Sequence, residues 1–123
     1  MSTPLAVVIE DNEDQADILS KALQAAGFAT EIIHDGDEAV ARLKAIVPDL
    51  VLLDLHLPGV SGTGVLLQIR ADPRLAGTRV VIATVEPQMA NVLRDKVDVV
   101  LAKPIEFSRL YDLAVSLISR IST

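Results

Sequence analysis

Acidic residues follow two short apolar runs in this sequence, at the points where the runs end. Asp54 follows residues 50–53, and the pair Glu10 and Asp11 follows residues 5–9. An apolar run of this length, bounded by polar residues, is typical of a strand buried on both faces of a parallel sheet. If the two strands are neighbours, the carboxylates meet at one edge, where like charges about 4 Å apart repel by roughly 4 kcal/mol at an effective dielectric of about 20.

A cation would relieve this repulsion. Carboxylate oxygens suit Mg²⁺, which binds one or two carboxylates and leaves its remaining positions to water and phosphate oxygens. The cluster therefore predicts magnesium-dependent phosphoryl chemistry.

Two further polar residues close apolar runs in the second half of the chain. Thr84 follows the apolar run 80–83, and Lys103 comes two residues after the end of the largely apolar segment 97–101. In a doubly wound sheet, ligands bind outside the carboxyl ends of the strands, where the strand order reverses. We therefore expect all these side chains to share one rim of the sheet.

Strand and helix patterns alternate along the whole chain, which indicates a single α/β domain over residues 1–123 with crossover helices on both faces of the sheet. We predict five strands, over residues 5–9, 30–33, 50–54, 80–83 and 97–101. Five helices are predicted, over residues 12–26, from Asp35 to Pro48, and over 64–71, 87–95 and 108–119. Gly27 is placed to end the first helix, and Asp35 to cap the second, with Glu38 three residues later.

Composition excludes several functional classes. The chain has 123 residues, of which 50% are hydrophobic and 23% charged, as expected for a compact folded protein. It has no cysteine, which removes disulfides and thiolate catalysis, and its net charge of -6 argues against nucleic-acid binding by this domain. No apolar stretch approaches the roughly 18 residues of a membrane span, and no basic segment of a signal peptide is present, so we expect a cytoplasmic protein.

Four segments together resemble the receiver domain of two-component response regulators. They are VIEDN at residues 8–12, DLHLPGVSG at residues 54–62, Thr84, and Lys103-Pro104. The resemblance implies a flavodoxin-like doubly wound (βα)5 fold with a parallel five-stranded sheet of order 2-1-3-4-5. It covers nearly the whole chain.

The resemblance also implies residue roles. Asp54 would accept a phosphoryl group from a phosphohistidine of a sensor histidine kinase or histidine phosphotransfer protein. Magnesium would be held by Asp11, Asp54, the backbone carbonyl of His56 and, partly through water, Glu10. Lys103 would place its charge on the phosphoryl oxygens, and the Thr84 hydroxyl would donate a hydrogen bond to one of them.

The same resemblance implies a switch. Thr84 moving toward the phosphoryl group would displace Val85 and Glu86, shifting a surface around the fourth helix and fifth strand that a downstream target or output domain reads. His56 would lie at the pocket rim and tune hydrolysis, and a cis bond before Pro104 would aim the lysine inward. His34 receives no role.

The sequence departs from the receiver pattern in the region that carries the switch. Val100 stands where most receivers have an aromatic residue, Val85 where alanine is common, and Lys96 where a glycine precedes the fifth strand. The interval from Thr84 to Lys103 is about three residues shorter than in many members, which predicts a trimmed or reoriented fourth helix. We therefore expect an unusual output surface beside intact acceptor chemistry.

Two other functions stay open at this stage. A pseudo-receiver, acting as a constitutive protein-binding scaffold, is favoured by Val100, Val85 and the short interval. A small magnesium-dependent phosphohydrolase is disfavoured, because His56 occupies the place where such enzymes carry a second acid. The leading interpretation is a signalling domain that is not a metabolic enzyme, with no output domain in these residues; whether it is part of a longer chain or forms a homodimer is left open.

Overall fold

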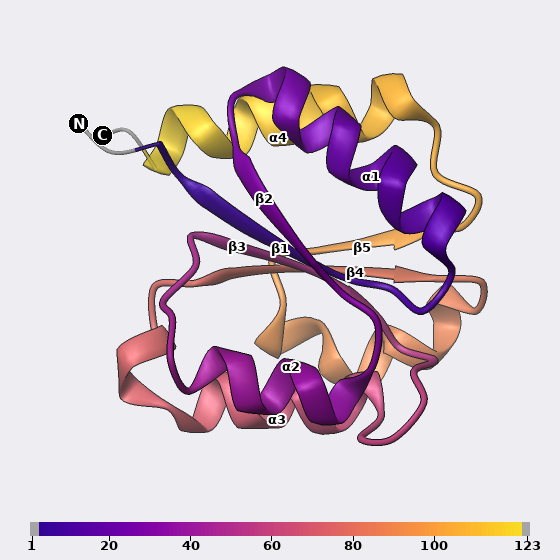
Figure 1. Ribbon diagram of the computed structural model, residues 1–123. Coiled ribbons are helices and arrows are strands. Elements are labelled where there is room, and N and C mark those ends of the chain that lie inside the picture. The colour runs from indigo at the N-terminus through magenta and orange to yellow at the C-terminus, as the bar shows by residue number, and fades with distance from the viewer. Residues whose placement is uncertain (1–2, 122–123) are drawn as a thin grey trace.

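The computed structural model describes residues 3–121 and shows one parallel sheet covered by helices on both faces (Figure 1). The strands lie in the order β2-β1-β3-β4-β5, all pairs parallel, which confirms the predicted doubly wound topology. Their bounds are β1 Leu5–Ile9, β2 Ala29–Ile33, β3 Leu50–Asp54, β4 Arg79–Thr84 and β5 Val99–Ala102.

Helices α1 and α4 cover one face of the sheet, and α2 and α3 cover the other (Figure 1). Their bounds are α1 Glu13–Ala26, α2 Gly36–Leu43, α3 Gly62–Ala71 and α4 Phe107–Ile121. Alternate residues of β1 enter different cores: Ala6 and Val8 pack beneath α1 and α4, whereas Val7 and Ile9 pack on the α2 and α3 side. Burial on both sides explains why the strands read as unbroken apolar runs.

The predicted helix caps are present. Gly27 ends α1 in the left-handed region at φ 117°, and the Asp35 side chain accepts a hydrogen bond from the Glu38 backbone N–H at 2.7 Å. Helix α2 ends at Leu43, earlier than Pro48, because the chain tightens there into a turn closed by the Ala45 N–H on the Arg42 carbonyl.

The fourth helix differs from the prediction. Pro87–Lys96 forms a 3-10 helix, η2, in place of an α-helix, and a second short 3-10 helix, η1 at Pro73–Leu75, was not predicted. The buried residues of η2, Ala90 and Leu93, are three positions apart, which matches one 3-10 turn. The shortened interval before β5 thus carries a narrower and more extended element than an α-helix of the same residues.

The chain enters β5 without a left-handed residue, although Lys96 stands where receivers commonly have a glycine. Within residues 3–121 a positive φ occurs only at Gly27 and Gly59, and Val97 is extended at φ -129°. The Arg70 side chain donates to the Lys96 carbonyl at 2.7 Å and so fixes the end of η2 from α3. The chain therefore takes a route that needs no left-handed residue there.

Gly62, the first residue of α3, lies against the backbone that leaves β3. A Cβ built at Gly62 would lie 2.3 Å from the Asp54 carbonyl oxygen, whereas a Cβ at Gly77 would meet nothing within 4 Å. We predict that Gly62→Ala lowers the free energy of unfolding by about 1–3 kcal/mol, the usual cost of forcing atoms into a packed site. The matched control Gly77→Ala should change it by less than about 1 kcal/mol. Urea unfolding measures both, and equal effects would contradict the close approach.

Candidate functional site

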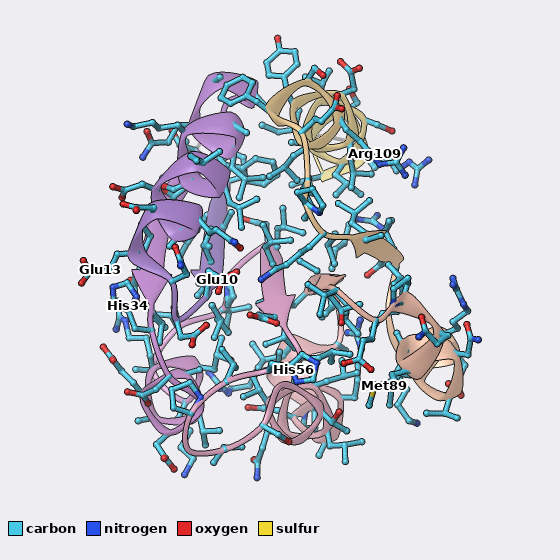
Figure 2. The ribbon with its side chains drawn as sticks, turned by 90° about the vertical axis from the view of Figure 1, so that its right-hand side faces the viewer. Glu10, Glu13, His34, His56, Met89 and Arg109 are labelled. Atoms are coloured by element: carbon cyan, nitrogen blue, oxygen red, sulfur yellow. The ribbon has the colours of Figure 1, made fainter. Side chains whose placement is uncertain are left out.

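The acidic residues predicted from the sequence meet at the carboxyl edge of the sheet. Strands β1 and β3 are neighbours with Ile9 opposite Leu53, so Glu10 and Asp54 emerge side by side. Oxygen atoms of Glu10, Asp11 and Asp54 all lie within 4.8 Å of one another. Glu10 and Asp54 are buried, at 2% and 6% exposure, whereas Asp11 faces solvent. Figure 2 views this edge and shows Glu10 near its centre.

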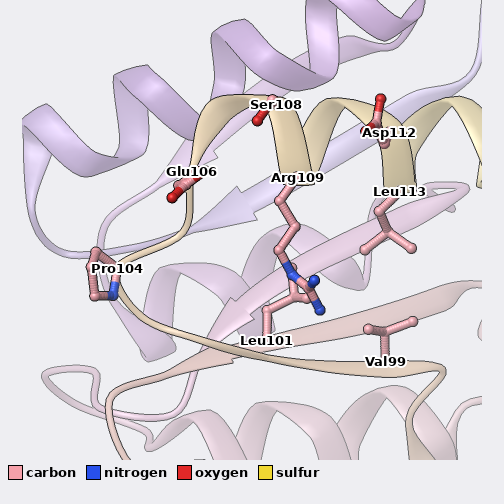
Figure 3. A pocket seen from close by; sticks show the side chains of 8 residues that line it. All are labelled: Val99, Leu101, Pro104, Glu106, Ser108, Arg109, Asp112 and Leu113. Atoms are coloured by element: carbon pink, nitrogen blue, oxygen red, sulfur yellow. The ribbon is translucent and has the colours of Figure 1, made fainter.

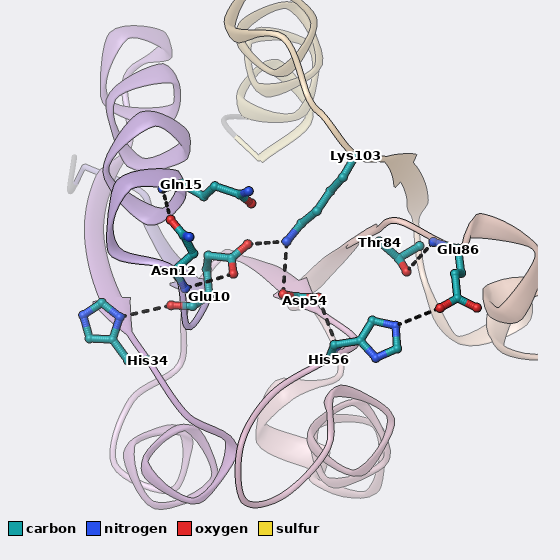
Figure 4. Close-up of polar contacts among 9 residues, drawn as sticks. All are labelled: Glu10, Asn12, Gln15, His34, Asp54, His56, Thr84, Glu86 and Lys103. Atoms are coloured by element: carbon teal, nitrogen blue, oxygen red, sulfur yellow. Dashed lines mark hydrogen bonds and ion pairs between the residues drawn. The ribbon is translucent and has the colours of Figure 1, made fainter.

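Lys103 reaches into this cluster from the loop after β5. Its Nζ donates to Glu10 Oε1 at 2.5 Å and to Asp54 Oδ2 at 3.0 Å (Figure 4). The Lys103-Pro104 peptide bond is cis, as predicted, and the Lys103 backbone N–H donates to the Thr84 carbonyl at 2.8 Å. The structure therefore joins the ends of β1, β3, β4 and β5 through one lysine.

The charges in the cluster do not balance. Burial raises the pKa of Glu10, the charge of Asp54 adds to this, and the hydrogen bond from Lys103 opposes it. Burial also acts to lower the pKa of Lys103, but its hydrogen bonds to Glu10 and Asp54 together raise that pKa above the ordinary value. The lysine thus stays charged, while the second acid makes Glu10 harder to ionise.

A cavity of about 280 Å³ opens over the cluster. Its lining residues are Glu10, Asp11, Asn12, Gln15, Asp54, His56, Val85 and Lys103. The His56 backbone N–H donates to Asp54 Oδ1 at 3.0 Å, so both oxygens of that carboxylate have a donor. Across the mouth, His56 Nε2 lies 3.6 Å from Glu86 Oε1 (Figure 4). The cavity therefore lies directly over the Asp54 carboxylate.

Thr84 lies beside this cavity without lining it. Its side chain is fully buried, and its Oγ1 accepts a hydrogen bond from the Glu86 backbone N–H at 3.1 Å. Val85, by contrast, is 63% exposed and forms part of the cavity wall. In this conformation the hydroxyl shapes the turn that follows β4.

The remaining switch residues lie on β5 and the loop that follows it. Val100 is half-buried and packs against the core on the α2 and α3 side. Pro104 lines a larger cavity, of about 750 Å³, between β5 and α4, where the Arg109 side chain extends over Leu101 (Figure 3). That cavity lies apart from the acidic cluster, and its lining offers no group of carboxylates comparable to the cluster around Asp54.

The sequence patterns did not predict two contacts at the acidic cluster. The Asn12 backbone N–H donates to Glu10 Oε2 at 3.2 Å, and His34 Nδ1 lies 3.1 Å from the Glu10 carbonyl oxygen. The register of β1 and β2, with Ile9 opposite Ile33, places position 34 beside position 10. Knowledge of this pairing is the signal that could have identified His34.

Comparison with known proteins identifies the family. The response regulator receiver domain family matches residues 6–115. The chain belongs to this family. The acidic cluster and Lys103 described above lie within the matched residues.

Known relatives and solved structures agree with this assignment. The DNA-binding response regulator MtrA of Mycolicibacterium smegmatis is 39% identical over 87 residues, which cover 71% of this chain and 37% of MtrA. The chain thus spans little more than a third of that relative's length. A CheY-like receiver domain from Methylobacillus flagellatus has a TM-score of 0.83 at 26% identity, covering 94% of this chain and 99% of the other.

A third neighbour is described with a metal ion. The receiver domain of the sensor histidine kinase PA1611 from Pseudomonas aeruginosa has magnesium coordinated in its active-site cleft. It has a TM-score of 0.83 at 22% identity, covering 96% of this chain and 99% of that domain, so the likeness concerns the fold alone.

The side chains of this receiver domain fit a hard divalent cation on their own chemistry. The available ligands are carboxylate oxygens, which suit Mg²⁺. Two of the three acids are buried, and the third, Asp11, is exposed at the cavity.

No helix among residues 3–121 has the length and apolar character needed to cross a membrane.

The raised pKa of Glu10 has a consequence for stability. A carboxyl group whose pKa is raised by folding contributes stability that is present below its ordinary pKa of 4.5 and is lost as the pH rises through the folded-state value. We predict that the unfolding free energy of wild type, relative to Glu10→Gln, declines as the pH rises from 4.5 toward neutrality in metal-free buffer. Urea unfolding across this range measures it; a difference that grows with pH would contradict the raised pKa.

Proposed function

We propose that this receiver domain accepts a phosphoryl group on Asp54 from a phosphohistidine of a sensor histidine kinase or histidine phosphotransfer protein, in a reaction that depends on Mg²⁺. The observation that carries the proposal is the placement of Asp54. Its carboxylate closes β3, is 6% exposed, and borders a cavity shared with two other acids and the charged Lys103.

The proposed transfer exchanges one bond for another. A lone pair of an Asp54 carboxylate oxygen attacks phosphorus, the P–N bond of phosphohistidine breaks, and its electron pair returns to the imidazole nitrogen of the partner. The product is an aspartyl phosphate with a new P–O bond. Since little covalent assistance is needed, most of the rate comes from positioning and charge neutralisation.

The residues around Asp54 would neutralise the negative charge of the phosphoryl group in two ways. Asp11, Asp54, the His56 backbone carbonyl and, through water, Glu10 would hold Mg²⁺, which would neutralise part of the charge on the phosphoryl oxygens. Lys103 now donates to Glu10 and Asp54, and its three N–H bonds allow it to turn a donor toward the phosphoryl group. The lysine keeps its charge in this exchange, because both acids remain beside it.

The proposed output begins at Thr84. The hydroxyl that now accepts from the Glu86 N–H would instead donate to a phosphoryl oxygen, and this exchange would move the turn that leads into η2. Val85 and Met89 are exposed at that turn and would move with it. Because η2 is a 3-10 helix and Val100 replaces an aromatic side chain, we propose a readout unlike that of the commonest receivers.

The partners follow from the same proposal. MtrA is described as DNA-binding, and the present chain spans 37% of its length, so any DNA contact would belong to an output domain or to a separate downstream protein. The net charge of -6 supports this assignment, since phosphate contacts require clustered basic residues. Autodephosphorylation would be intrinsic to the acyl phosphate, and we propose no metabolic turnover.

A small phosphodonor tests the acceptor chemistry without the cognate kinase. We predict that incubation with acetyl phosphate and MgCl₂ adds the mass of one phosphoryl group to the wild-type protein, and that Asp54→Asn, which keeps the shape of the side chain, gains none. Removing the metal with EDTA should abolish the gain. Intact-protein mass spectrometry measures each result.

The other outcomes separate the competing functions. An equal gain in Asp54→Asn would exclude Asp54 as the acceptor. No gain in wild type would contradict the proposal and favour the constitutive scaffold. Release of phosphate in large excess over protein would indicate a phosphohydrolase.

A further inference from the structure

The His34 ring is held against the backbone of the acidic loop. Its Nδ1 lies 3.1 Å from the carbonyl oxygen of Glu10 (Figure 4). A carbonyl oxygen only accepts hydrogen bonds, so Nδ1 must carry the proton and donate it. This contact fixes the ring orientation and leaves Nε2 pointing away from the loop.

The His34 side chain replaces a backbone N–H as the hydrogen-bond donor to the Glu10 carbonyl. Ile9 lies opposite Ile33, and the Glu10 N–H donates to the Ile33 carbonyl at 3.0 Å, which extends the ladder one residue beyond β1. In a parallel ladder, the next donor to the Glu10 carbonyl would be the N–H of residue 35. Asp35 instead begins α2 as its N-cap, and the His34 ring occupies the donor position.

The carbonyl that His34 holds belongs to the peptide unit between Glu10 and Asp11. Because the peptide unit is planar, its orientation fixes the position of the Asp11 Cα, from which the side chain leaves the backbone. Glu10 has further anchors in Lys103 and the Asn12 N–H, whereas Asp11 is exposed on the cavity side. The placement of Asp11 therefore depends on the backbone around it.

We propose that His34 is a positioning residue for the cation site, acting through the Glu10 carbonyl to hold the Asp11 carboxylate where it can bind Mg²⁺. This inference rests on the proposed function, because it concerns the same site. His34 is exposed and belongs to neither core cluster, so its contribution is to the acidic loop rather than to the packing of the domain.

Two substitutions isolate the hydrogen bond. His34→Ala removes the donor, whereas His34→Asn keeps an N–H at the same number of bonds from the backbone and removes the imidazole. MgCl₂ titration by calorimetry, with amide NMR shifts of Asp11 as a second readout, gives the dissociation constant of each variant. We expect His34→Ala to bind Mg²⁺ about three- to tenfold more weakly, the range for one lost hydrogen bond. His34→Asn should recover most of the affinity.

The control measurements separate positioning from stability and from charge. The unfolding free energy of metal-free His34→Ala should fall by no more than about 1.5 kcal/mol, the range for one lost hydrogen bond, because His34 buries no core surface. If His34 acted only as a positive charge near the acids, its removal would strengthen Mg²⁺ binding. Equal or tighter binding by His34→Ala, or an equal loss in His34→Asn, would overturn the inference.

Wild type and Asp54→Asn in the same titration separate this inference from the proposed function. If wild type binds Mg²⁺ and is labelled by acetyl phosphate while His34→Ala matches it in affinity, the role of His34 fails alone. If wild type does not bind Mg²⁺, both fail.

Discussion

The excess of negative charge at the carboxyl edge of the sheet is the constraint on which the candidate site depends. Carboxylate oxygens of Glu10, Asp11 and Asp54 lie within 4.8 Å of one another. One lysine, Lys103, forms ion pairs with the two buried acids, Glu10 and Asp54. Lys103 relieves the two buried acids but leaves the exposed one unmatched within the cluster. The arrangement is thus poised to gain from a divalent cation, and a cation there would in turn draw phosphoryl oxygens toward Asp54.

The sheet imposes this arrangement, which is why the sequence could predict it. Parallel strands ending at one edge deliver whatever follows them to a common rim, and the apolar runs mark where each strand stops. The sequence therefore placed Asp54 and Thr84 correctly at strand ends. It also placed Asp35 correctly as the N-cap of α2. Knowledge of the family added the strand order and the inward lysine, which periodicity could not supply.

Features that depend on contacts between distant residues were not predictable in the same way. The type of helix at Pro87–Lys96 depends on how little chain is available before β5 and on Arg70 binding its end from α3. The Thr84 hydroxyl accepts a hydrogen bond from the Glu86 N–H and so points toward its own loop. No sequence pattern predicts this orientation. The role inferred for His34 requires the register of β1 and β2, which becomes visible only once the strands are paired.

The excess negative charge at the sheet edge can be tested by urea unfolding with and without MgCl₂, at ionic strength matched with NaCl. A ligand that binds the folded state alone raises the unfolding free energy with its concentration, by about 2.7 kcal/mol at a hundredfold excess over its dissociation constant. We predict that MgCl₂ stabilises wild type in this way, and that Asp54→Asn and Asp11→Asn lose most of the gain. The same stabilisation in all three proteins, or none in wild type, would contradict it.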